Sequence, residues 1–192
     1  MRYKAIVIGV SAGGLDALGI ILPALDANLP LPVLVVQHIS PQSDSYMVKH
    51  LNAICSITVK EAEDKENPKP GVIYVAPPNY HLLVEPDGVM SLSMEDRVNF
   101  ARPSIDVLFE SAADAWSPDL IGIILTGANE DGSMGLAKIK SCGGLTIVQD
   151  PATAFVDRMP KAAIAGTTVD YILPLDEIGP LLNQLTNSTI ME

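Results

Sequence analysis

Positively charged residues and histidines are scarce in this chain of 192 residues. Twelve lysines and arginines stand against 23 aspartates and glutamates, so the formal net charge is −11. Proteins that bind nucleic acid or anionic membrane surfaces through electrostatics carry basic surfaces, so we expect neither partner. The three histidines are also too few and too scattered for a zinc site. We therefore expect no metal ion.

Cysteines and long apolar runs are lacking as well. Cys55 and Cys142 are not spaced as a metal or redox pair, so we expect reduced thiols in a cytoplasmic protein. No apolar stretch reaches the roughly 18 residues that a membrane span requires. The N-terminus enters a strand pattern at once, with none of the features of a signal peptide. We expect no membrane insertion.

Apolar residues make up 48% of the chain and alternate between continuous runs and amphipathic stretches. Runs this apolar predict strands buried on both faces, and hence a parallel sheet covered by helices. We expect strands at 5–9, 32–38, 71–77, 120–127, 144–150 and 170–175, and helices at 13–25, 44–54, 104–116, 133–143, 159–166 and 175–185. A hairpin is expected at 80–94 and a surface loop at 60–71. With no linker or repeat, residues 1–192 are expected to form a single domain.

A glycine-rich stretch, "AIVIGVSAGGLDAL" at residues 5–18, follows the first strand. It resembles a dinucleotide-binding loop, but Ser11 stands where that loop needs its second glycine. The second strand ends in Gln37 and His38 rather than in the acid that would bind a ribose. No Gly-Lys-Ser/Thr follows, so a P-loop is not supported either. We therefore expect no nucleotide cofactor.

The same stretch contains the pattern G-x-S-x-G from Gly9 to Gly13. A serine at such a strand-to-helix turn presents its hydroxyl at the carboxyl edge of the sheet, beside backbone N–H groups that can hold an oxyanion. The alternative is that Ser11 only caps the following helix, which is a common role for serine. The motif alone supports the two interpretations equally.

A nucleophilic serine needs a base, and His38 is the best candidate. It directly follows the second strand, and parallel strands end on one edge of the sheet, where open α/β sheets bind ligands. His50 lies in a predicted helix, and we expect it to be partly exposed. His81 begins a predicted strand, and we expect it nearer the opposite edge, where it can line a cleft or simply pack.

The base in turn needs a carboxylate to orient it. The turn after the strand at 120–127 supplies Glu130 and Asp131 on the same sheet edge. Asp131 is the better candidate because Gly132 permits a close turn around it, whereas we expect Glu130 to face solvent. Either acid can alternatively serve only as a favourable charge at a helix N-terminus.

These segments together resemble a known family, the protein-glutamate methylesterase domain of bacterial chemotaxis. The resemblance covers nearly the whole chain, in order, and rests on "IGVSAGG", "VVQHIS", "VIYVAPPNYHLLV", "RPSIDVLFESAA", "GIILTGANEDGSMGL" and "VQDPATAFVDRMPKAAI". It implies a three-layer α/β/α fold with a doubly wound, mostly parallel sheet. It also implies hydrolysis of glutamyl methyl esters on chemoreceptors with release of methanol, and in some members deamidation of glutamine.

By the same resemblance, the nucleophile falls on Ser11, the base on His38 and the acid on Asp131. The backbone N–H groups of Ala12 and Ala128 fall on the oxyanion donors. Many members have Met-Gly where this chain has Ala128-Asn129, which alters the shape of the pocket. The family's regulated form also carries an N-terminal receiver domain. Here the catalytic pattern begins at residue 3, so we expect no receiver domain.

The sequence thus predicts a monomeric serine esterase that acts on the cytoplasmic helices of methylated chemoreceptors without a cofactor. Two alternatives stay open at this point. One is an esterase with a different substrate, and the other is a catalytically silent module that docks onto signalling proteins. A complete Ser-His-Asp set argues against the second.

Overall fold

A parallel seven-stranded sheet forms the centre of the molecule in the computed structural model, which describes residues 3–40 and 45–187. Its strand order is β3-β4-β2-β1-β7-β8-β9, and every neighbouring pair is parallel. The strands are β1 (Ala5–Val10), β2 (Val33–Gln37), β3 (Thr58–Glu61), β4 (Val72–Val75), β7 (Leu120–Ile124), β8 (Leu145–Gln149) and β9 (Tyr171–Leu173). The expected doubly wound, mostly parallel sheet is confirmed.

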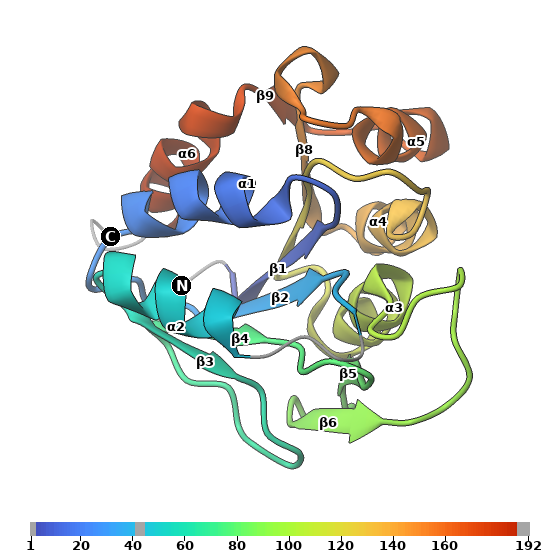
Figure 1. The fold of residues 1–192 in the computed structure, drawn as a ribbon. Coiled ribbons are helices and arrows are strands. Elements are labelled where there is room, and N and C mark those ends of the chain that lie inside the picture. Colours follow the sequence, from blue (N-terminus) through green and yellow to red (C-terminus); the bar gives the residue numbers. More distant parts are fainter. Residues whose placement is uncertain (1–2, 41–44, 188–192) are drawn as a thin grey trace.

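Helices cover both faces of this sheet, which gives three layers (Figure 1). On one face lie α1 (Gly14–Ile21), α2 (Tyr46–Ile54) and α6 (Leu175–Asn187). On the other face lie α3 (Ile105–Trp116), α4 (Ser133–Ser141) and α5 (Arg158–Gly166). Two short 3₁₀ helices, Leu22–Ala24 and Pro151–Thr153, follow α1 and β8.

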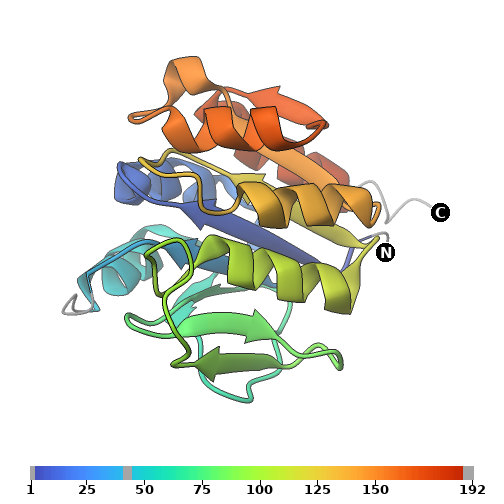
Figure 2. The same ribbon diagram turned by 90° about the vertical axis from the view of Figure 1, so that its right-hand side faces the viewer.

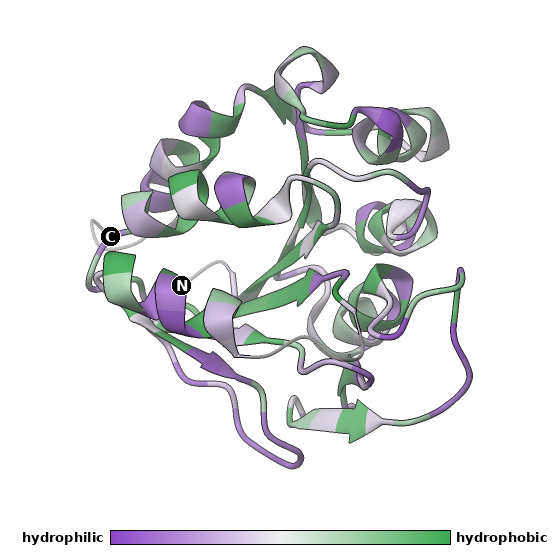
Figure 3. Cartoon of the chain, in the orientation of Figure 1, coloured by the Kyte–Doolittle hydropathy of each residue, from purple (hydrophilic) through white to green (hydrophobic). Residues whose placement is uncertain are grey.

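The central strands are buried on both faces because their side chains alternate between two apolar cores. From β1, Ile6 and Ile8 pack into the core beneath α1 and α6, whereas Ala5 and Val7 pack into the core beneath α3 and α4. In Figure 3 the central strands are accordingly mostly green, whereas the helices mix green and purple. This double burial explains why the strands are continuous apolar runs in the sequence.

A separate antiparallel hairpin of β5 (His81–Val84) and β6 (Met90–Ser93) lies beside α3. The backbone N–H of Val84 donates a hydrogen bond to Ser111 Oγ of α3 at 3.1 Å. The hairpin predicted at 80–94 is therefore confirmed, and Figure 2 shows it below the sheet on the α3 side.

The expected loop at 60–71 is wrong at its start, because Lys60 and Glu61 belong to the edge strand β3. Among the described strands, β4 is its one partner, and Val59 is its one buried residue. An edge strand carries charged side chains and little apolar surface, so it lacks the sequence pattern of a central strand.

The strand order determines which loops meet at the carboxyl edge. β1 lies between β2 and β7, and Gly9 pairs with Val36 on one side and with Ile124 on the other. The segments that follow these three strands therefore converge at one place, where open α/β sheets bind ligands. Within 3–40 and 45–187, no helix is long and apolar enough to cross a membrane.

Candidate active site

The turn after β1 holds Ser11 through its backbone. Ser11 N–H donates to Thr126 O at 2.9 Å, and Ser11 O accepts from Gly14 N and from Gln37 Nε2, each at 2.9 Å. The N-cap of α1 is Gly13, with a left-handed φ of 78°, so the helix-cap interpretation of Ser11 is wrong. Ser11 Oγ forms no hydrogen bond with any residue that the structure describes. Its hydroxyl is thus left available for chemistry.

The Gln37 side chain links the Ser11 turn to the next residue in the chain, His38. Its buried amide also donates to His38 O at 2.8 Å. A Cβ at Gly14 would lie 1.7 Å from Gln37 Oε1, so only glycine fits beside this side chain. Where a dinucleotide fold would place an acid, this chain therefore uses an amide that fixes two loops together.

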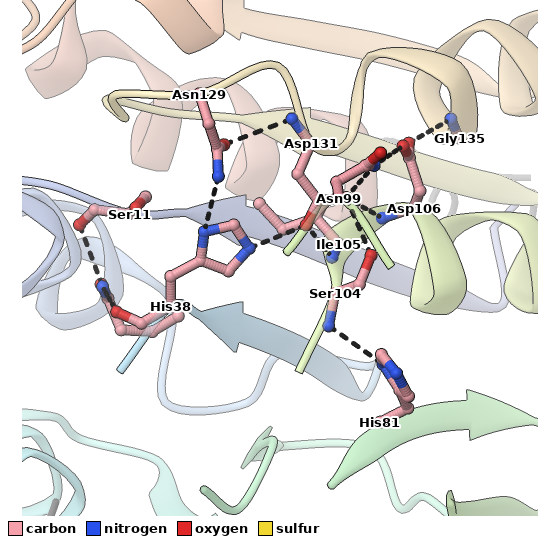
Figure 4. A network of polar contacts seen from close by, with 11 residues as sticks. Ser11, His38, His81, Asn99, Ser104, Ile105, Asp106, Asn129, Asp131 and Gly135 are labelled. Carbon is pink, nitrogen blue, oxygen red and sulfur yellow. Dashed lines mark hydrogen bonds and ion pairs between the residues drawn. The ribbon is translucent and has the colours of Figure 1, made fainter. Parts of the chain in front are cut away.

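His38 and Asp131 form the shortest polar contact between catalytic candidates. His38 Nε2 lies 2.7 Å from Asp131 Oδ2. Because an ionised carboxylate only accepts hydrogen bonds, Nε2 must carry the proton in the neutral ring. The lone pair is then on Nδ1, which faces Asn129 and the Ser11 side of the site (Figure 4). The ring is therefore oriented so that Nδ1 is the basic atom.

Asp131 is fully buried and accepts hydrogen bonds from both side chains and backbone. Its donors are His38 Nε2 (2.7 Å), Asn99 Nδ2 (2.9 Å), Ser104 Oγ (2.8 Å), Ile105 N (2.6 Å) and Asp106 N (3.2 Å). Burial alone would raise the pKa of this carboxyl, but the hydrogen bonds from His38, Asn99, Ile105 and Ser104 outweigh it and lower the pKa. The carboxylate therefore stays ionised at neutral pH.

Two of those donors are the first backbone N–H groups of α3, so Asp131 caps a helix that is distant in sequence. Ser104 occupies the N-cap position of α3. Its side chain makes no cap bond and donates instead to Asp131. The N-terminus of α3 thus stabilises the Asp131 carboxylate, and the carboxylate in turn accepts the hydrogen bonds of the helix's first N–H groups.

Glu130, the adjacent acid, is exposed and pairs with Arg158 at 3.0 Å. The preceding residue, Asn129, bridges the two halves of the site. Its Oδ1 accepts from Asp131 N at 3.2 Å, and its Nδ2 lies 3.4 Å from His38 Nδ1. This amide is therefore a weak donor to the basic nitrogen.

The other two histidines are placed elsewhere. His81 is buried on the hairpin, where Nδ1 accepts from Ser104 N at 3.2 Å and Nε2 donates to Asp96 O at 3.0 Å. The expectation that it lies near the opposite sheet edge is wrong, because it sits beneath the start of α3 (Figure 4). Both of its nitrogens are occupied, so it packs rather than reacts. His50 is exposed and stacks on Tyr46.

Ala12 directly follows Ser11 in the turn after β1, and Ala128 lies in the connection after β7, the strand that pairs with β1. Thr126 Oγ1 donates to Ala12 O at 2.8 Å and accepts from Val156 N at 2.9 Å, which fixes the turn that presents Ala12. Neither alanine N–H donates to another residue within the described ranges. In those ranges, no group of three or more histidine, cysteine or acidic side chains has the arrangement of a metal site.

Asp106 is a second buried carboxyl beside Asp131. Its Oδ1 accepts from Gly135 N at 2.7 Å, and its Oδ2 accepts from Asn99 Nδ2 at 2.8 Å. Burial raises the pKa of Asp106 to about 6, and the charge of Asp131 adds to this, against the opposing hydrogen bonds of Gly135 and Asn99. The Asn99 amide thus donates hydrogen bonds to two carboxyl groups, one with a raised pKa and one with a lowered pKa.

Sequence reasoning missed Gln37, Asn99, Ser104 and Thr126 as parts of the site. Gln37 and Thr126 carried a signal, since each ends or follows a central strand at the carboxyl edge. Asn99 carried none, because it lies in a polar connection between the hairpin and α3.

Comparisons with known proteins agree with one another. The family model described as CheB methylesterase matches residues 6–182. A relative from Leptospira interrogans is 53% identical over 190 residues, covering 99% of this chain and 98% of that protein. The protein-glutamate methylesterase/protein-glutamine glutaminase of Thermotoga maritima is 38% identical and covers 95% of this chain, which spans 54% of that protein. The crystal structure of the Thermotoga maritima CheB methylesterase catalytic domain matches with a TM-score of 0.91 at 39% identity, covering 95% of this chain and 98% of that one.

The raised pKa of Asp106 predicts a pH-dependent stability. A carboxyl whose pKa rises from 3.8 to about 6 on folding binds its proton more tightly in the folded state. The free energy of unfolding should therefore fall as pH rises from about 4 to about 6, by at most about 3 kcal/mol from this group. Asp131 acts in a different window, because its lowered pKa matters only below about pH 4.

Urea unfolding at several values between pH 4 and 7 measures this effect. Asp106→Asn should abolish the fall, and the exposed Glu110→Gln on the same helix should keep it. Equal pH slopes for the wild type and Asp106→Asn would contradict the assignment.

Proposed function

The chain belongs to the CheB methylesterase family, whose members are carboxylic ester hydrolases, and we propose that Ser11, His38 and Asp131 are its catalytic residues. The observation that carries the proposal is the 2.7 Å contact from His38 Nε2 to a buried, ionised Asp131. Ser11 follows the neighbouring strand β1, and its hydroxyl makes no hydrogen bond with a described residue. The substrate we propose is a glutamyl γ-methyl ester on the cytoplasmic helices of a chemoreceptor.

In the acylation step, Ser11 Oγ attacks the ester carbonyl carbon and His38 Nδ1 takes the serine proton. The protonated ring then gives that proton to the methoxy oxygen, and methanol leaves as the acyl-enzyme forms. Water attacks the acyl-enzyme by the same route, with Nδ1 as the base. The products are the glutamate γ-carboxylate and free Ser11.

Charge develops on two groups during these steps. The tetrahedral oxyanion is held by the N–H groups of Ala12 and Ala128, whose hydrogen-bonding capacity is unused in the described part of the chain. The imidazolium of His38 is stabilised by the Asp131 carboxylate, which also fixes the proton on Nε2. No step needs a cofactor.

The printed names of the relatives also include protein-glutamine glutaminase. The same acyl-enzyme forms from a glutamine side chain when ammonia, rather than methanol, is the leaving group. We propose that this chain catalyses both reactions and that the ester reacts faster, because methoxide is a better leaving group than an amide nitrogen.

The proposal is tested by incubating the protein with chemoreceptor membranes that carry radioactive methyl groups and counting released methanol. Ser11→Ala should lose more than 95% of the release while keeping the fold, since the substitution removes no hydrogen bond to a described residue. Ser141→Ala, an exposed serine on α4, is the matched control. A folded Ser11→Ala protein that releases methanol at the wild-type rate would show that Ser11 is not the nucleophile.

The two adjacent acids can be separated in the same assay. Asp131→Asn should lower kcat at neutral pH by roughly a hundredfold or more, because an amide cannot stabilise the imidazolium. Glu130→Gln should change kcat by less than about tenfold, equivalent to 1.4 kcal/mol. The Tm of both variants shows whether the fold is kept when residue 131 can no longer cap α3 as a carboxylate. If Glu130→Gln is the impaired variant and Asp131→Asn is not, the acid has been misassigned.

Asn129 offers a further test of Nδ1 as the basic atom. Its amide donates weakly to that nitrogen and competes with Ser11. Asn129→Ala should leave kcat within about threefold of wild type or raise it. Asn129→Asp places a carboxylate at Nδ1, which holds a proton there, so kcat at pH 7 should fall at least tenfold. Equal kcat values for the two variants would indicate that Nδ1 does not accept the serine proton.

A further inference from the structure

A tight turn between β6 and α3 lies beside the catalytic residues. Val98 and Ala101 exchange two backbone hydrogen bonds, of 3.1 and 2.9 Å, around Asn99 and Phe100. Both central residues have positive φ, 52° for Asn99 and 64° for Phe100. Two consecutive left-handed residues make this a type I′ turn, which favours Asn first and Gly second.

Phe100 therefore occupies a position that favours glycine. A left-handed backbone is strained for a bulky side chain, yet Phe100 is 94% exposed, so its ring gains almost no packing within the described chain. Strained residues persist where the surroundings hold them, and they cluster at functional sites. Neither local geometry nor core packing explains a phenylalanine here.

Hydrogen bonds from both Asn99 and the adjoining Arg102 anchor this turn. The Arg102 guanidinium donates to Met94 O at 2.7 Å, to Glu95 O at 2.8 Å and to Asn79 Oδ1 at 2.8 Å. From the tip itself, the Asn99 amide reaches the catalytic acid, at 2.9 Å from Asp131 Oδ1 (Figure 4). Phe100 thus lies at the tip of a turn that hydrogen bonds anchor to the candidate active site.

A hollow of about 190 Å³ lies at this place, and its lining includes His38, Asn129, Asn99, Phe100 and Arg97. Sites that enclose a whole small-molecule ligand measure roughly 300–1,000 Å³. This hollow is smaller and suits one side chain that enters from a larger molecule. The remainder of that molecule must lie outside, where it can contact the exposed part of Phe100.

A charged residue that lines the hollow indicates what kind of molecule enters it. The chain is strongly acidic, yet the exposed Arg97 lines the hollow and forms no ion pair with a described residue. A guanidinium next to an exposed aromatic ring suits a surface that presents both acidic and apolar side chains. On a helix such residues share a face when they lie three or four positions apart.

We propose that Phe100 is a specificity-determining docking residue, which contacts an apolar side chain one helical turn from the esterified glutamate of the substrate protein. The inference rests on the proposed function and deepens it, because it states how a protein ester is distinguished from a free one. Arg97 pairs with a neighbouring acidic residue of the same helix. Phe100 itself takes no part in bond making.

The experiment compares two substrates in each variant. One is the capped single residue N-acetyl-glutamyl γ-methyl ester amide, and the other is a chemoreceptor cytoplasmic fragment methylated on its glutamates. Phe100→Ala and Phe100→Gly should each lower the ratio of kcat/KM on the protein to kcat/KM on the small ester at least tenfold, mainly through KM. Tyr171→Ala, an exposed tyrosine at the amino end of β9, should leave the ratio unchanged.

Thermal unfolding gives a second readout that a merely structural role would not produce. Because glycine relieves the left-handed strain, Phe100→Gly should raise the Tm by about 2–4 °C while its docking is lost. An unchanged substrate ratio in both variants, with wild type active on both substrates, overturns this inference alone. A wild-type protein inactive on both substrates overturns the proposed function and this inference with it.

Discussion

The buried carboxylate of Asp131 is the constraint on which the rest of the site depends. An unpaired charge at this depth would be costly, and removing one partner of a buried charged group typically costs about 3–5 kcal/mol. Asp131 is satisfied by donors from three separate segments: the end of β2, the turn before α3 and the start of α3 itself. The requirement to satisfy one charge therefore fixes His38, the Asn99 turn and the α3 N-terminus relative to one another. The same hydrogen bonds therefore position the proposed catalytic residues and stabilise the fold.

A second consequence concerns Asp106, whose carboxyl shares the Asn99 amide with Asp131. Two buried carboxylates so close repel each other when both are ionised. The protein resolves this by giving Asp131 more donors, including the α3 backbone, and Asp106 fewer. Their pKa values consequently move apart, with that of Asp131 lowered and that of Asp106 raised to about 6. Asn99 can serve both because its amide has two hydrogens.

The sequence predicted those features that follow from burial and strand direction. Apolar runs indicated the parallel sheet, and the ends of its strands placed Ser11, His38 and Asp131 on one edge. Sequence reasoning failed where a contact depends on residues far apart in the chain. The capping of α3 by Asp131 instead of by the Ser104 side chain, and the burial of His81 under that helix, have no local pattern. The strand β3 was missed because an edge strand with one buried side chain is not apolar.

The position of β1 explains why Asp131 meets Nε2 of His38. In the well-known protease triad the carboxylate contacts Nδ1, and Nε2 serves the serine. Here His38 follows β2 and Asp131 lies beyond β7, with β1 between them. Strands two places apart are separated by roughly 10 Å, so the imidazole must reach across the end of β1 to meet the acid. The nitrogen farther from the backbone, Nε2, makes this contact at 2.7 Å. The nearer nitrogen, Nδ1, is left 3.4 Å from the Asn129 amide. The strand order thus determines which ring nitrogen the carboxylate holds, and it leaves Nδ1 for the proposed role of base.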